Sequence, residues 1–101
     1  MIVFHAKFIG EPDTIAQLRV AAIAMEQASR ADAGCIDYVF STPLREPNAI
    51  CITEEWETMA AWQAHFAAPH TTAFTAAMRK FPPQRVEVKM LEAKQLPFPP
   101  S

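Results

Sequence analysis

The stretch EEWETMAAWQAHFAAPHTTAF, residues 54–74, passes from the end of a strand into two consecutive helices. Met59, Trp62 and Phe66 recur at the spacing of one helical face, which predicts a first helix that ends near residue 68. Pro69 has no amide hydrogen, so it interrupts that helix and suits the first turn of another. The stretch therefore predicts two short helices that meet at the proline.

Four segments outside these helices alternate apolar and polar residues with the period of a strand, at residues 2–9, 35–41, 49–56 and 85–93. Between the first two, apolar residues recur at helical spacing after Pro12, and Gly34 is a natural stop for that helix. Its apolar face carries Ile15, Leu18, Ala22 and Met25. In the second strand, Ile36, Tyr38 and Phe40 are expected to share one face.

The chain of 101 residues is one domain by its length. The order β-α-β-β-α-α-β predicts an α+β fold, in which helices cover one face of a four-stranded antiparallel sheet. We expect this domain over residues 1–92. The segment 93–101 ends in KQLPFPPS, which is too rich in proline to continue a sheet.

The first and third strands carry apolar residues on both faces. In the first strand, Phe4 and Phe8 point to one side, and Val3 and Ile9 point to the other. Helices would cover one side only, and the bare side would be an apolar patch of a size that soluble monomers rarely expose. This pattern predicts a symmetric homodimer in which two sheets pack face to face.

Charge and hydropathy exclude several classes of partner. The net charge is −2 and the basic residues are scattered, whereas a nucleic-acid surface needs clustered lysine and arginine. No apolar run approaches the ~20 residues of a membrane span. The first residues lack the basic start and the apolar stretch of a secretion signal, so a cytoplasmic location is expected.

Cys35 and Cys51 lie in the second and third strands, which a proline-containing loop joins as a hairpin. Pairing across this loop would place Cys35 opposite residue 55, and Tyr38 near Ile52. The two cysteines would then be offset by four residues, or ~13 Å at ~3.3 Å per residue. A disulfide needs Cα atoms within ~7 Å, so we expect two free thiols.

Two histidines flank Pro69. His70 falls on one helical face with Phe74 and Met78, which predicts that it points into the core. A buried histidine needs a hydrogen-bond partner, so the pattern fits either a paired core residue or a proton shuttle in a pocket. His65 is expected at the flank of its helix, at the mouth of such a pocket.

Glu54 shares a strand face with Ile52 and Trp56. If the helices cover that face, burial would raise the pKa of Glu54 and make it a candidate base. If they do not, Glu54 would lie in the dimer interface beside a basic residue of the partner. Trp62 and Phe66 fit either plain core packing or a platform for a substrate ring.

Known cofactor motifs are missing from the sequence. It contains no glycine-rich phosphate loop, no H-E-x-x-H, no G-x-S-x-G and no C-x-x-C pair. We therefore expect neither a metal cluster nor a bound cofactor, and any redox chemistry has to come from the substrate itself.

The run GCIDYVFS at residues 34–41, a proline-containing loop, and ITEEWETMAAWQAHFAAPHTTAF at residues 52–74 resemble the antibiotic biosynthesis monooxygenase family. The similarity extends over residues 2–92. It implies a ferredoxin-like fold, dimers whose sheets form an α+β barrel, and a pocket in each subunit between the sheet and the two short helices. By position, His65 and His70 match the family's histidines beside the proline, Glu54 matches its strand end, and Tyr38 matches its aromatic residue in the second strand.

Members of this family include cofactor-free enzymes that convert phenols, anthrones or quinols to quinones with dioxygen. The resemblance thus implies a cofactor-independent monooxygenase of a small electron-rich aromatic. The candidate catalytic residues are His70, His65 and Glu54, and the candidate substrate contacts are Tyr38, Trp62, Phe66, Phe74 and Met78. Other members degrade haem, but Thr75 falls near the place of their proximal histidine, so haem is not expected here. The alternatives are a proton-shuttling isomerase and a non-catalytic dimer that binds a small apolar molecule.

Overall fold

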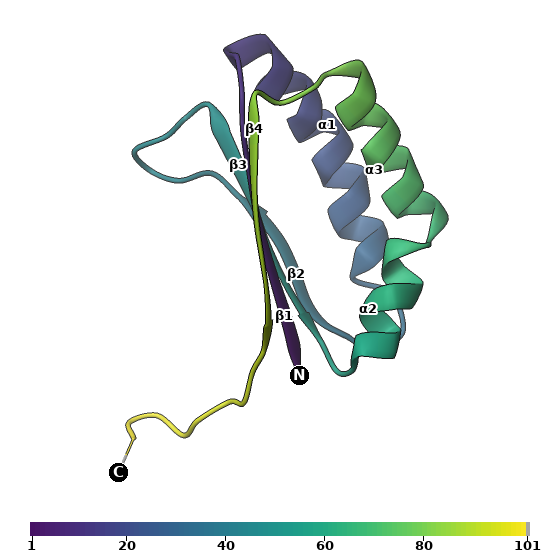
Figure 1. The fold of residues 1–101 in the computed structure, drawn as a ribbon, viewed down its shortest axis with the longest axis vertical. Coiled ribbons are helices and arrows are strands. Elements are labelled where there is room, and N and C mark those ends of the chain that lie inside the picture. The colour runs from purple at the N-terminus through teal and green to yellow at the C-terminus, as the bar shows by residue number, and fades with distance from the viewer. Residues whose placement is uncertain (101) are drawn as a thin grey trace.

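The structure is a computed structural model that describes residues 1–100. In chain order its elements are β1 (Ile2–Ile9), α1 (Pro12–Ser29), β2 (Cys35–Ser41), β3 (Ala49–Trp56), α2 (Met59–Phe66), α3 (Pro69–Lys80) and β4 (Arg85–Glu92). The strands form one antiparallel sheet in the order β2-β3-β1-β4. All three helices lie on one face of it (Figure 1). The α+β, ferredoxin-like arrangement expected from the sequence is confirmed.

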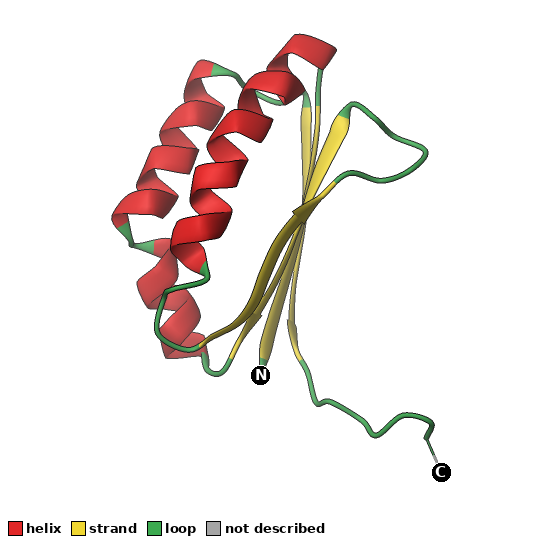
Figure 2. Ribbon diagram, turned by 180° about the vertical axis from the view of Figure 1, so that it is seen from behind, coloured by secondary structure: helices red, strands yellow, loops and turns green. Residues whose placement is uncertain are grey.

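Apolar periodicity explains how the helices attach to the sheet. The expected face of α1 is buried, with Ile15 and Leu18 completely inaccessible to solvent. The break at Pro69 is also confirmed, since α2 ends at Phe66 and α3 begins at the proline. Seen from behind in Figure 2, the helices form one layer, and the loop between β2 and β3 projects away from them. Among residues 1–100, no helix is both long and apolar enough to cross a membrane.

The pairing of β2 with β3 differs from the expected register. Tyr38 lies opposite Glu54 rather than near Ile52, and Cys35 lies opposite Trp56. A bulge between Cys35 and Asp37 inserts one extra residue, which no hydrophobic pattern signals. Because of the bulge, Ile36 does not share the buried face of Tyr38, and it is 49% exposed. Both cysteines are free, as expected.

The bare face of the sheet carries both apolar and polar side chains of β1. Val3 and Ile9 are half-buried there, and His5 and Lys7 lie between them on the same face. The two edge strands of the sheet also differ. On β2, side chains hydrogen-bond to the outward-facing backbone groups: Glu26 accepts from the Phe40 amide at 2.7 Å, and Arg30 donates to the Tyr38 carbonyl at 3.0 Å. On β4, the other edge, every residue is exposed.

Candidate functional site

A cavity of about 190 Å³ lies between the sheet and helices α2 and α3. Its lining includes Glu54, His65 and all five side chains expected to contact a substrate, namely Tyr38, Trp62, Phe66, Phe74 and Met78. Val86 and Val88 of β4 also line it, and their exposed fractions of 47% and 60% mark the side on which it opens. An apolar cavity of about 150 Å³ can hold one benzene ring, so the size suits a single aromatic ring.

Glu54 lies on the helix-facing side of β3 and is only 3% exposed to solvent. The indole Nε1 of Trp56 donates a hydrogen bond of 2.9 Å to Glu54 Oε1. Burial raises the pKa of Glu54 to about 7, although the Trp56 hydrogen bond opposes the rise. This carboxyl group can therefore hold or release a proton near neutral pH. Of the two alternatives left open by the sequence, the buried carboxyl is the one found in this chain.

His65 lies in the last turn of α2 and is also 3% exposed. Its ring packs against the rings of Trp56 and Tyr38, with centroids 4.5 and 5.3 Å away. Nδ1 is 2.9 Å from Asp32 Oδ2, while Nε2 is 3.6 Å from Glu54 Oε1. Burial lowers the pKa of His65, although Asp32 opposes this shift. A neutral ring that donates from Nδ1 to Asp32 keeps a lone pair on Nε2, on the side of Glu54.

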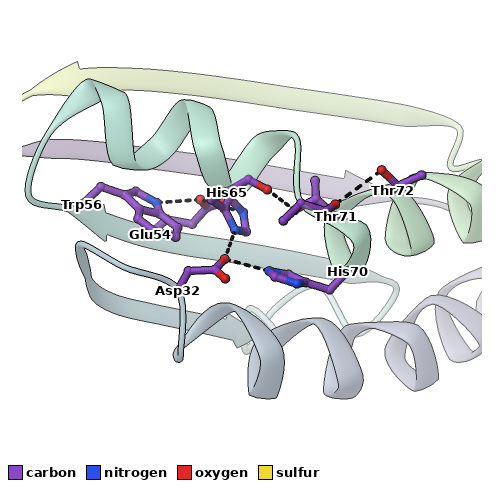
Figure 3. Close-up of polar contacts among 8 residues, drawn as sticks. Asp32, Glu54, Trp56, His65, His70, Thr71 and Thr72 are labelled. Atoms are coloured by element: carbon purple, nitrogen blue, oxygen red, sulfur yellow. Dashed lines mark hydrogen bonds and ion pairs between the residues drawn. The ribbon is translucent and has the colours of Figure 1, made fainter.

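Asp32 is a site residue that the sequence analysis missed. It belongs to the loop between α1 and β2, and its Oδ2 also lies 2.7 Å from His70 Nε2 (Figure 3). One carboxylate oxygen thus joins the two histidines that flank Pro69. The only signal in the sequence was an acidic residue two positions before Gly34.

Gly34 holds the loop of Asp32 against α2. Its φ of 78° lies in the left-handed region, and a Cβ there would come within 2.6 Å of the Ala61 Cβ. The Glu57 amide donates a hydrogen bond of 2.8 Å to the Gly34 carbonyl. Because Ala61 precedes His65 by one helical turn, this close approach brings Asp32 within reach of the imidazole.

The expected burial of the two histidines is wrong, and the structure reverses it. His65 is buried in the cavity wall, while the His70 side chain is 22% exposed and does not line the cavity. His70 instead shares a small hollow with Ala21 and Ala24 of α1. The cause lies in α2, whose apolar stripe is not its buried face. Phe66 on that stripe is 61% exposed, and the flank that carries His65 packs inward.

Tyr38 is completely buried beside His65. Among the described residues, neither its hydroxyl nor the Oγ of Ser29 has a hydrogen-bond partner. Burial raises the pKa of Tyr38 far above its ordinary value, and the nearby Glu54 carboxylate adds to the rise. Tyr38 therefore stays protonated, and its hydroxyl can donate a hydrogen bond but cannot serve as a base.

The expectation that the chain holds no set of possible metal ligands is wrong. Asp32, His65 and His70 each offer one ligand atom, and these atoms lie within 4.8 Å of one another. Two histidines and one carboxylate are a donor set that suits iron or zinc. The two hydrogen bonds to Asp32 Oδ2 account for the same closeness without an ion.

Solved structures of other proteins share this fold. One from Deinococcus radiodurans, assigned to the antibiotic biosynthesis monooxygenases, aligns with a TM-score of 0.88 at 27% identity and covers 95% of each chain. A protein from Mycobacterium tuberculosis gives 0.85 at 23% identity, over 94% of this chain and 96% of its own. One from Nitrosomonas europaea gives 0.85 at 13% identity, over 92% of this chain and 98% of its own.

Among curated proteins, none matches this sequence. The family model described as antibiotic biosynthesis monooxygenase matches residues 1–77, which include the strands, helices and loop that supply Asp32, Glu54, His65 and His70. The chain belongs to the antibiotic biosynthesis monooxygenase family.

Proposed function

We propose that this protein is a cofactor-independent monooxygenase that oxidises a small phenol or quinol with dioxygen. The observation that carries the proposal is the pairing of His65 with Glu54 in the wall of a ring-sized apolar cavity. Membership of the family supports the reaction class. The volume of about 190 Å³ favours a substrate with one ring, and the larger anthrone type would have to project between Phe66 and β4.

Substrate binding would use the aromatic and apolar lining of the cavity. Trp62 and Phe66 stack with centroids 5.1 Å apart, and Phe4 lies 6.0 Å from Trp62. These faces can pack on an aromatic ring and exclude water from it. The protonated hydroxyl of Tyr38 is a candidate donor to the substrate oxygen.

The first chemical step would remove the hydroxyl proton of the substrate. Nε2 of neutral His65 is the candidate acceptor, and Glu54 shares that role because its pKa of about 7 lets either group hold the proton. The resulting anion is electron-rich enough to pass an electron to dioxygen in a site from which water is excluded. His70 would act through Asp32 rather than on the substrate, since it lies outside the cavity lining.

The reaction balances without a cofactor. A phenol and one dioxygen give a quinone and one water: a carbon–oxygen bond forms on the ring and the oxygen–oxygen bond breaks. The second oxygen atom leaves as water with the ring hydrogen and the hydroxyl hydrogen of the substrate. The ring supplies all the electrons.

Oxygen uptake with a panel of single-ring phenols, quinols and anthrones tests the proposal. We expect one dioxygen consumed per quinone formed, with no hydrogen peroxide. An isomerase would change its substrate in the absence of oxygen. A purely binding protein would show a raised melting temperature with these compounds and no oxygen consumption, and either result would contradict the proposal.

A further inference from the structure

We propose that Asp32, held in place by His70, is a proton outlet that connects the buried His65 to solvent on the side of the ring opposite the substrate. This inference rests on the proposed function, because it concerns the proton that His65 takes from the substrate. It assigns a role to Asp32, and it makes His70 a positioning residue rather than a group that contacts the substrate.

The site needs such a route because both candidate bases are enclosed. His65 and Glu54 are each only 3% exposed, and the cavity they line opens past Phe66, Val86 and Val88. A bound aromatic ring would fill that opening. A proton taken up by Nε2 of His65 would then have no path to water on the substrate side.

The geometry supplies a path on the other side of the imidazole. Nδ1 of His65 lies 2.9 Å from Asp32 Oδ2, and the Asp32 side chain is 21% exposed. His70 Nε2 lies 2.7 Å from the same oxygen, and its side chain is 22% exposed. The chain from Glu54 through His65 to Asp32 therefore runs from a buried carboxyl group to one in contact with solvent (Figure 3).

Each transfer along this path conserves protons. The substrate hydroxyl gives a proton to Nε2 of His65, Nδ1 gives one to Oδ2 of Asp32, and Asp32 gives one to water. When oxygen has added to the ring, the peroxide anion needs a proton before water can leave, and the same path carries one back. The titratable groups that face His65 are Asp32 from the α1–β2 loop, Tyr38 from β2, Glu54 from β3 and His70 from α3. Of these, only the side chains of Asp32 and His70 reach solvent.

Replacement of Asp32 by asparagine tests the outlet. Asp32→Asn keeps an oxygen that can accept from His65, but the amide cannot carry a proton. We expect kcat to fall at least ~10-fold with little change in KM, a smaller loss than the ~10²-fold or more expected when the acid–base group itself is removed. Formate or acetate in the buffer should restore part of the rate to this variant, and Asp32→Glu should retain more activity than Asp32→Asn. Asp13→Asn makes the same chemical change on an exposed carboxylate of α1 and should leave kcat unchanged.

Two kinetic results would overturn the outlet. One is an Asp32→Asn variant with the kcat and pH profile of the wild type. The other is a slow variant that neither formate nor the Asp32→Glu substitution restores, since that result indicates a structural role. Stoichiometric iron or zinc in the isolated protein, lost in Asp32→Asn, would also overturn it and assign the three side chains to a metal.

Nitrogen-15 NMR of the histidine rings tests the outlet without turnover. We expect His65 to carry its proton on Nδ1 in the wild type and to titrate at a lower pH in Asp32→Asn, because Asp32 is the group that raises its pKa. An identical titration in both proteins would overturn the outlet. If no substrate is oxidised by the wild type, the proposed function fails, and the NMR comparison still decides whether Asp32 controls the protonation of His65.

Discussion

Nε2 of His65 lies 3.6 Å from Oε1 of Glu54, and both side chains are almost completely buried. Burial reverses the usual order of their pKa values, since it raises that of Glu54 to about 7 and lowers that of His65 below its ordinary 6.5. A proton that the two groups share therefore rests on the carboxyl group and leaves the imidazole neutral, as a base requires. This property distinguishes the pair from an ordinary buried ion pair.

The burial of Glu54 should make the stability of the protein depend on pH. Its pKa is about 7 in the folded protein against an ordinary value of 4.5, so the unfolded chain ionises first as the pH rises. The wild type should therefore lose up to about 3 kcal/mol of unfolding free energy between these pH values, with no further loss above them. Glu54→Gln removes this loss. Urea unfolding at a fixed protein concentration should therefore show that the unfolding free energy of the variant rises relative to that of the wild type as the pH increases over this range.

The matched control for this comparison is Glu57→Gln, because Glu57 is exposed. Its difference from the wild type should stay constant with pH. The contribution of His65, which weakens the fold as the pH falls below 6.5, is the same in the wild type and in Glu57→Gln and cancels between them. Parallel curves for Glu54→Gln and the wild type would show that Glu54 is ionised at its ordinary pKa.

Gly34 should be needed for both stability and the site. Alanine there would hold a positive φ and place its Cβ 2.6 Å from the Ala61 Cβ, so the loop that carries Asp32 must move away from α2. We expect Gly34→Ala to lower the unfolding free energy by about 1–3 kcal/mol and to reduce turnover. In Gly10→Ala the nearest atoms to the new Cβ are 3.6 Å away, so this control should change both quantities much less. Equal losses in the two variants would contradict the positioning role of Gly34.

The sequence predicted more of the fold than of the site, for physical reasons. Strand and helix bounds follow from local periodicity, and Pro69 marks the break between α2 and α3 directly. The relation of Asp32 to His65 depends instead on a loop that passes close to a helix far along the chain. The orientation of α2 could not be predicted from local periodicity either. The buried flank of this helix carries His65, and its apolar stripe includes the exposed Phe66.

The protein should be a homodimer in solution. The motive is the apolar side chains on both faces of β1, and the exposed Leu91 of the edge strand β4, which lies opposite Val3 on the bare face. Obligate interfaces of this kind usually bury more than ~2,000 Å² and persist on dilution. Light scattering at micromolar concentration should give twice the mass of the chain, and a monomer mass would contradict the prediction.

The purified protein should contain two free thiols per chain and no metal. Cys35 and Cys51 are free, and a thiol reagent under denaturing conditions should count both. We expect oxygen uptake to survive treatment with a chelator, because the proposed reaction draws its electrons from the substrate. A haem absorption band, or activity that a chelator removes and iron or zinc restores, would contradict the cofactor-free account.

The most direct test of the central claim is kcat for His65→Gln on a phenol or quinol that the wild type oxidises. Glutamine keeps a polar side chain that can donate to Asp32, but it cannot take a proton from the substrate. We predict a fall of ~10²-fold or more in kcat, with the melting temperature close to that of the wild type. A variant that folds normally and keeps the wild-type kcat would contradict the assignment of His65 as the base.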